Sequence, residues 1–161
     1  MYRFILAITL TITAFQSSPI AIAEDAHPKE DAHPKLEFRI AEATASDGLT
    51  KHNVPGDEKP VFVTDRTVVT GDDIKKVSFF DDVFGNPAIG FKLTAEGGAK
   101  LWAATSANVG KRLAIMLDGE VVSAPKFSGG IRDKSVIRGN FDNNDLTRFF
   151  RAIVLRSAPP D

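Results

Sequence analysis

The sequence contains no cysteine, one tyrosine and one tryptophan among its 161 residues. The lack of cysteine excludes disulfide bonds, thiolate metal sites and thiol catalysis, so a hydrophobic core must hold the folded domain together. The formal net charge is only -1, so no general attraction to nucleic acid or to an anionic membrane is implied. The chain also lacks a Gly-x-Ser-x-Gly motif, a phosphate-binding loop, a dinucleotide fingerprint and a zinc-binding histidine pair.

Long apolar runs are scarce, and the one that stands out lies between Phe4 and Phe15. Its length suits the hydrophobic part of a signal peptide better than a membrane span. Residues 21–23 have the small-x-small pattern of a cleavage site, so we expect residues 1–23 to be a signal peptide cleaved between Ala23 and Glu24. A retained N-terminal anchor is the alternative. We therefore expect a periplasmic or secreted protein with no membrane span after cleavage.

Residues 24–35 are an exact tandem repeat of the hexapeptide Glu-Asp-Ala-His-Pro-Lys. The repeat has no large apolar side chain to bury, so it is predicted to be a disordered tether. His27 and His33 lie near carboxylates and could offer metal ligands, but a flexible segment supplies no fixed coordination geometry. We predict no metal site and no cofactor.

The rest of the chain, residues 36–161, is predicted to be one domain with short strands and two helices. Because neighbouring strands are joined by short turns, the expected fold is α+β, with a mostly antiparallel sheet and two helices packed on one face. The predicted strands are Leu36–Ile40, Val61–Val63, Thr67–Thr70, Val77–Phe80, Ala88–Leu93, Leu113–Leu117, Glu120–Ala124 and Ser135–Arg138, with a loop at Ala45–Pro60, a turn at Asp65-Arg66, and helices at Ala95–Val109 and Asn143–Arg156.

The clearest local signal is a hairpin around Asp118-Gly119, a pair typical of a two-residue type I′ turn. Such a turn places Ile115 opposite Val122 and Met116 opposite Val121. Both faces of the hairpin are then apolar, so we expect a central position in the sheet with cover on each side.

The predicted first helix begins with a capping residue, Thr94, and contains two adjacent glycines, Gly97 and Gly98. Each glycine costs about 1 kcal/mol relative to alanine inside a helix. The pair therefore indicates either close approach of another segment or a frayed first turn. Gly110 is well placed to end the helix in a left-handed conformation.

Side chains that could support catalysis are few and scattered. His52 is the only histidine inside the predicted domain, and it lies in a polar stretch where a solvated role is more common than a general base. Asp72-Asp73 and Asp81-Asp82 are adjacent pairs that point to opposite sides of an extended chain, and turn formation explains them better. We predict that the protein is not an enzyme.

Phenylalanine is the abundant aromatic residue, with twelve copies. Phe79, Phe80 and Phe84 cluster near a predicted hairpin tip, and Phe127 begins a loop. If these four side chains are exposed, they form an apolar surface that could bind polypeptide; otherwise they belong to the core. An unpaired strand edge near residues 61–70 could also accept a strand from a client peptide, unless a loop or the tether covers it.

Seven stretches, in order, resemble the head subdomain of the large periplasmic region of the SecD or SecDF protein-export subunit. They are Leu36–Arg39, Val54–Glu58, Arg66–Ile74, Asn86–Leu93, Asn108–Pro125, Gly139–Phe141 and Phe150–Ala152. The resemblance implies an α+β head outside the membrane that contacts emerging or translocated polypeptide, and it implies no catalytic residue.

These observations lead to two hypotheses about function. The first is a non-enzymatic binding module that contacts unfolded or exported polypeptide, or the Sec export machinery. The alternative is a structural subunit of an envelope complex that uses the same fold to bind one specific partner. A hydrolase ranks third, and it would require a pocket that joins His52 to a carboxylate.

Overall fold

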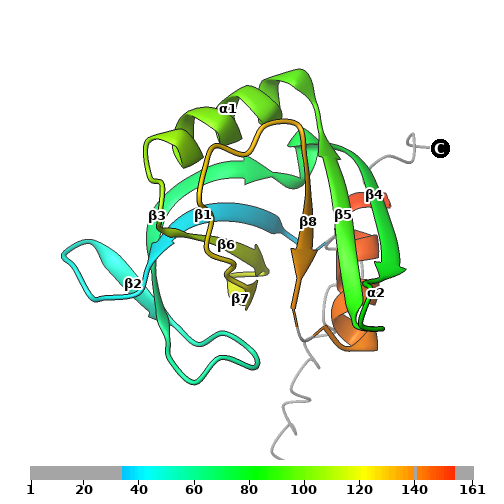
Figure 1. The fold of residues 1–161 in the computed structure, drawn as a ribbon, viewed down its shortest axis with the longest axis horizontal. Helices are drawn as coiled ribbons and strands as arrows, with labels where there is room; N and C mark the ends of the chain where they lie inside the picture. Colours follow the sequence, from blue (N-terminus) through cyan, green and yellow to red (C-terminus); the bar gives the residue numbers. More distant parts are fainter. Residues whose placement is uncertain (1–33, 140, 155–161) are drawn as a thin grey trace, which may run out of the picture. The chain divides into compact units, whose positions relative to one another are not determined.

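The computed structural model describes residues 34–139 and 141–154 (Figure 1). The predicted signal peptide, its cleavage site and nearly all of the hexapeptide repeat lie outside the described residues. The elements within them are β1 (Leu36–Glu42), β2 (Leu49–His52), β3 (Val61–Thr70), the 3-10 helix η1 (Gly71–Asp73), β4 (Ile74–Asp81), β5 (Pro87–Leu93), α1 (Ala95–Ser106), β6 (Arg112–Leu117), β7 (Glu120–Ser123), β8 (Lys134–Arg138) and α2 (Asn143–Val154).

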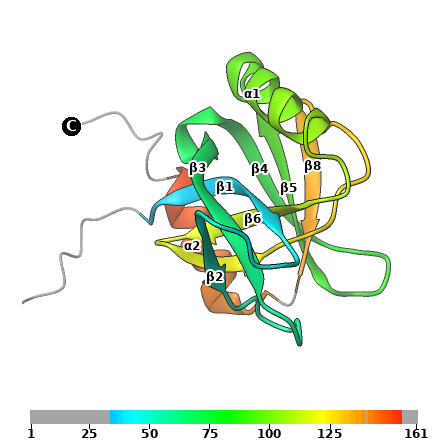
Figure 2. The ribbon, with the colours of Figure 1, turned by 90° about the vertical axis from the view of Figure 1, so that its left-hand side faces the viewer.

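The strands form two antiparallel sheets, a first sheet in the order β2-β3-β1-β6-β7 and a second sheet in the order β4-β5-β8. This arrangement confirms a mostly antiparallel α+β fold. The expectation of a single sheet is wrong, because β4 pairs with β5 and β5 pairs with β8, a strand much further along the chain. Helix α1 contacts β3 and β5, whereas α2 contacts β4 and β1 (Figures 1 and 2). The packing of both helices on one face stays a prediction.

The main hydrophobic core lies between the two sheets and includes both helices. The rings of Phe38 in the first sheet and Phe91 in the second meet edge to face, with centroids 5.0 Å apart. Alternate residues of β1, β5 and β6 face this core, as the two-residue period of a strand requires. Its buried members include Leu36, Phe38, Ile40, Val69, Ile89, Phe91, Leu93, Leu101, Leu113, Ile115, Leu117, Phe127, Ile137, Phe149 and Ile153.

The other face of the first sheet is also covered. A smaller buried cluster forms there from Ala41, Val54, Val61, Val63, Ala114, Met116, Val121 and Ala124. The burial of β6 on both faces confirms the cover predicted on each side of the hairpin. However, β7 is the last strand of its sheet, so the hairpin does not occupy the central position that we expected.

The β6–β7 hairpin confirms the predicted turn and half of the predicted register. Asp118 and Gly119 both have positive φ, at 52° and 85°, as a type I′ turn requires. Met116 lies opposite Val121 as predicted. Ile115, however, lies opposite Ser123 and not Val122, because a bulge between Ile115 and Met116 inserts an extra residue into β7.

Two further expectations for the N-terminal half are wrong. The segment predicted as a loop at Ala45–Pro60 contains β2, whose polar sequence lacks a strand signal and which pairs with the start of β3. The two short strands predicted around Asp65-Arg66 are one continuous strand, β3. The irregularity there is a bulge, because β3 moves from Thr67 to Val63 while β1 advances only from Arg39 to Ala41.

Helix α1 begins as predicted, and its glycines are explained by close approach. The Thr94 hydroxyl oxygen accepts a hydrogen bond from the Gly97 N–H at 3.1 Å. A Cβ atom at Gly97 would lie 2.6 Å from the Cβ of Asp73, so the first turn is tightly packed and not frayed. The helix ends at Ser106, before the predicted Val109, and Gly110, with φ of 88°, belongs to the following turn.

No helix among residues 34–139 and 141–154 combines the length and the apolar character that crossing a membrane would require.

Candidate polypeptide-binding surfaces

The β4–β5 hairpin exposes an unusual group of large apolar side chains. We define the aromatic hairpin by Phe79, Phe80, Val83 and Phe84, which are 37%, 42%, 92% and 84% exposed. The structure therefore excludes a fully buried role for the three phenylalanines that the sequence had grouped at this tip. Their part in binding stays a prediction.

Asp82 fixes the shape of the hairpin tip. Its carboxylate Oδ1 accepts hydrogen bonds from the backbone N–H groups of Phe84, at 2.9 Å, and Asn86, at 3.0 Å. The bonds from Asn86 and Phe84 hold the pKa of the Asp82 carboxyl below its usual value, so the acceptor stays ionised to a lower pH than an ordinary aspartate does. Gly85, with φ of 79°, allows the chain to reverse here. The tip thus presents Val83 and Phe84 on an ordered turn.

Phe127 does not belong to this surface, which corrects the sequence-based prediction. Its side chain is only 6% exposed and packs in the main core. The reason lies in its backbone, whose N–H donates to the Lys111 carbonyl at 3.2 Å and whose carbonyl accepts from the Gly110 N–H at 3.0 Å. These bonds hold the loop against the segment between α1 and β6, so the ring turns inward.

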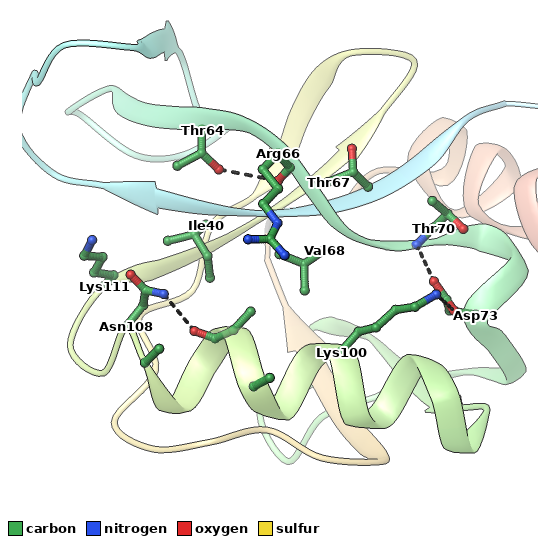
Figure 3. A pocket seen from close by; sticks show the side chains of 13 residues that line it. Ile40, Thr64, Arg66, Thr67, Val68, Thr70, Asp73, Lys100, Asn108 and Lys111 are labelled. Atoms are coloured by element: carbon green, nitrogen blue, oxygen red, sulfur yellow. Dashed lines mark hydrogen bonds and ion pairs between the residues drawn. The ribbon is translucent and has the colours of Figure 1, made fainter.

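A second candidate surface is a groove of about 770 Å³ between β3 and α1 (Figure 3). Its apolar lining combines Ile40 of β1 and Val68 of β3 with three alanines of α1 and its C-terminal end, Ala103, Ala104 and Ala107. Val68 and Ala104 also pack against the main core. The groove therefore reaches down to the core between the first sheet and the helix.

Three of the four charged residues that line the groove are cations. Lys100 bonds to Asp73 at 3.1 Å and to Glu96 at 2.9 Å, and these two acids raise its pKa, with Glu96 contributing most. Lys111 bonds to Glu42 at 2.7 Å. Among the described residues no carboxylate forms an ion pair with Arg66, whose guanidinium points toward α1 in Figure 3. The groove thus offers an apolar floor beside a cation that is free to bind an anionic group.

The upper wall of the groove includes part of the strand edge that the sequence suggested as a peptide acceptor. Strand β2 pairs with residues 61–64 of β3. Beyond Thr64, no described strand lies beside β3 on that side, and α1 lies opposite across the groove (Figure 3). The prediction of an unpaired edge is therefore wrong for the first part of β3, residues 61–64. For the rest of β3 it stays a prediction that this edge accepts a peptide. The groove itself was missed, because alanines on a helix give no distinctive sequence signal.

The histidine and the paired aspartates do not form a catalytic site among the described residues. His52 shares a hollow of about 440 Å³ with Glu120 and Asp145, but no hydrogen bond joins His52 to either acid, and the lining contains no serine, threonine or cysteine. Asp73 instead accepts a hydrogen bond from the Thr70 N–H at 3.0 Å. In the part of the chain that the structure describes, no three or more histidine, cysteine or acidic residues are grouped to hold a metal.

Comparison with known proteins identifies the class of domain. Residues 38–158 match the family described as SecDF, P1 head subdomain. The chain is 41% identical over 90 residues to protein translocase subunit SecD of Aquifex aeolicus, a match covering 56% of this chain and 18% of that protein. It is 32% identical over 136 residues to SecD of Elusimicrobium minutum, covering 83% of this chain and 28% of that protein.

Two solved structures share the fold. A crystal structure of SecDF in the super-membrane-facing form superposes with a TM-score of 0.58 at 28% identity, covering 78% of this chain and 19% of that one. A structure described as that of SecDF, a membrane component that enhances protein export, gives a TM-score of 0.57, covering 78% and 63%. The chain belongs to the SecDF P1 head subdomain family, and it spans less than a third of the length of the curated relatives described above.

Proposed function

We propose that this protein is an extracytoplasmic, non-enzymatic binding module that contacts unfolded or exported polypeptide, or the export machinery. Membership of the SecDF head family supports a role connected with protein export. The observation that carries the proposal is the aromatic hairpin, with four large apolar side chains exposed on the end of β4 and the ordered turn that follows it. Apolar groups gathered on the surface of a domain are typical of interaction sites.

The hairpin suits weak and reversible contact with many sequences. Burying an exposed phenylalanine contributes roughly 2 kcal/mol, and part of that gain is lost to the ordering of the bound chain. Two or three such contacts, about 4–6 kcal/mol together, correspond to dissociation constants on the order of tens of micromolar to millimolar. Apolar contact is also non-directional, so it does not require one particular client sequence.

A titration with a fluorescently labelled, permanently unfolded protein tests the proposal. We expect saturable binding at micromolar concentrations, weakened at least tenfold by combined replacement of Phe79, Phe80 and Phe84 with serine. Val109→Ser is the matched control, because Val109 is 57% exposed but lies after α1, away from the hairpin. The absence of saturable binding by the unmodified protein would reject the function.

The proposed organisation places the head domain at residues 36–161, preceded by the tether at 24–35 and a signal peptide at 1–23. Cleavage after Ala23 would release the domain into the periplasm or the exterior. Mass spectrometry of the protein purified from a cell-envelope fraction tests this organisation. A mature chain that begins at Glu24 supports it, whereas an intact N-terminus supports a retained anchor.

The second candidate function is that of a partner-specific subunit of an envelope complex. The groove between β3 and α1 favours it, because a preformed apolar cleft beside Arg66, which has no carboxylate partner among the described residues, suits a folded partner that presents an acidic segment. Affinity purification tests this alternative. Recovery of one stoichiometric partner that is lost on Arg66→Glu and kept on Lys126→Glu, a change at an exposed lysine outside the groove, would favour it over general polypeptide binding.

A further inference from the structure

Strand β4 is an open edge of the second sheet. It pairs with β5 on one side, and no described strand pairs with it on the other. Helix α2 contacts β4 from the core side, where Phe149 and Ile153 share the main core with Val77. At the opposite margin of the sheet, the Ser123 hydroxyl donates to the Arg138 carbonyl of β8 at 3.2 Å. The edge of β4 is therefore available for pairing as far as the described strands are concerned, and the edge of β8 is engaged at one end.

The features that usually prevent pairing are concentrated in the first part of this edge, and the second part carries one charged residue, Asp81. Lysine side chains and bulges protect natural edge strands. Lys75 and Lys76 lie at the start of β4, together with a bulge between Ile74 and Lys76. The remaining stretch, residues 77–81, has a regular register with β5, contains no proline or lysine, and includes Phe79 and Phe80. An extended chain can therefore pair along residues 77–81 and place one further side chain beside Lys76, the residue directly before this stretch.

The two phenylalanines of β4 flank this edge on opposite faces of the sheet. Val77 packs against the main core, so Phe79 shares the inner face by the two-residue period of the strand. Phe80 lies on the outer face, where its ring covers Gly90 of β5; a Cβ atom at Gly90 would be 3.1 Å from the Phe80 ring. A strand added beside β4 would place side chains next to both rings.

A row of lysines sets the charge that the added strand should carry. Lys76 of β4 lies opposite Lys92 of β5, and Lys92 lies opposite Lys134 of β8, all on the outer face. Like charges directly opposite one another are destabilising. No carboxylate among the described residues forms an ion pair with any of the three lysines. An acidic side chain next to Lys76 would therefore relieve this repulsion.

We infer that the free edge of β4 binds an extended polypeptide segment by strand addition, and that it prefers a segment with an acidic residue beside Lys76 and an apolar residue beside Phe80. These two positions are four residues apart on the same face. The inner face adds a preference for apolar residues beside Val77 and Phe79. This inference rests on the proposed function, since it names the binding mode and the chemistry of the polypeptide at the aromatic hairpin.

Labelled peptides with the core Asp-Val-Ser-Val-Phe, and with the reversed core Phe-Val-Ser-Val-Asp, test the inference for the two possible strand directions. We expect one of them to bind the purified chain at least tenfold more tightly than a peptide of the same composition with the order scrambled. N-methylation of one alternate set of backbone amides should weaken binding at least tenfold, whereas methylation of the other set should change it less than threefold. Amide hydrogen exchange should slow in β4 on binding.

Charge reversal tests the register. Lys76→Glu should remove the preference for aspartate and create one for a peptide with lysine at that position, whereas Lys126→Glu should leave the preference unchanged. Equal effects of the two methylation sets, or no protection of β4, would overturn strand addition even if unfolded protein still binds through the hairpin. If self-association of the chain through β4 blocks peptide binding, the occupant of the edge is a second copy of the chain. If peptides bind only after residues 24–35 are deleted, the occupant is that segment. Either result would overturn the inference.

Discussion

The replacement Gly97→Ala tests how tightly α1 is held against the rest of the domain. Gly97 lies in the first turn of α1, where the Cβ of an alanine would be 2.6 Å from the Cβ of Asp73 and 3.0 Å from the Asp73 carbonyl oxygen. Asp73 cannot retreat easily. Its carboxylate accepts from the Thr70 N–H at 3.0 Å and from Lys100 at 3.1 Å, and its carbonyl accepts from the Thr94 N–H at 2.8 Å.

Two opposing effects determine how much Gly97→Ala changes the free energy of unfolding. Alanine is favoured over glycine inside a helix by about 1 kcal/mol. Overpacking a close contact costs about 1–3 kcal/mol, and weakening the hydrogen bonds of Asp73 adds about 1 kcal/mol for each bond lost. We therefore expect Gly97→Ala to lower the free energy of unfolding by about 1–3 kcal/mol, because the contact involves Cβ and backbone atoms that have little freedom to move.

Urea denaturation followed by circular dichroism measures this change, and the neighbouring glycine supplies the control. At Gly98 the nearest atom to an added Cβ is the Arg132 carbonyl oxygen, at 3.2 Å. A shift of a few tenths of an ångström relieves that contact, so Gly98→Ala should alter stability by less than about 1 kcal/mol. Stability equal to or above that of the unmodified protein for Gly97→Ala would refute the argument that this glycine sets the distance between α1 and η1.

Four further substitutions test the fold and the hairpin. Thr94→Ala removes the cap of α1 and should lower the free energy of unfolding by about 1 kcal/mol in urea titration. Phe127→Ala should cost about 3–5 kcal/mol because the ring is buried, whereas Phe84→Ala should change stability by less than about 0.5 kcal/mol; equal costs would contradict their assigned environments. Burial opposes ionisation of Glu37, but hydrogen bonds from Lys35 and Thr67 and the nearby Arg39 outweigh it, so its pKa lies below the usual 4.5. Ionised Glu37 therefore stabilises the fold fully above pH 4.5, and this stabilisation is lost as the pH falls through the lowered pKa. Glu37→Gln should make the free energy of unfolding in urea less dependent on pH in this acid range.

The elements that the sequence predicted well are those whose signals are local. The turn at Asp118-Gly119 and the cap at Thr94 depend on a few adjacent residues, and the structure confirms both. In α2, the predicted apolar stripe places Phe149 and Ile153 in the core. Phe150, a member of the same stripe, is 46% exposed.

The division into two sheets was not predictable from local patterns. β5 pairs with β8, although α1 and the β6–β7 hairpin lie between them in the sequence. Such a pairing depends on packing between distant segments, which a periodic pattern does not encode. β2 was missed for a related reason, since its polar residues are stabilised by pairing with β3 and not by their own burial.

At the candidate site, local sequence also failed to predict which single side chains are exposed. Phe84 and Phe127 are the same residue type in similar turn-rich surroundings, yet one is exposed and the other buried. The difference lies in the hydrogen bonds that join the Phe127 backbone to Gly110 and Lys111, segments that the sequence does not link to it. The sequence identified a group of aromatic residues as candidates for binding. Only the tertiary contacts distinguish the exposed side chains of this group from the buried one.

The two sheets are covered unequally, and for this reason we expect polypeptide contacts mainly at the second sheet. Both faces of the first sheet carry buried apolar clusters, so most of its side chains serve stability. The second sheet has a core face, but its outer face carries Lys76, Lys92 and Lys134, and its edge strand β4 is largely exposed. A domain that needed only stability would have little reason to leave Phe79 and Phe80 on such an edge, where they promote aggregation. The polypeptide binding proposed above would cover these side chains for part of the time and so reduce that hazard.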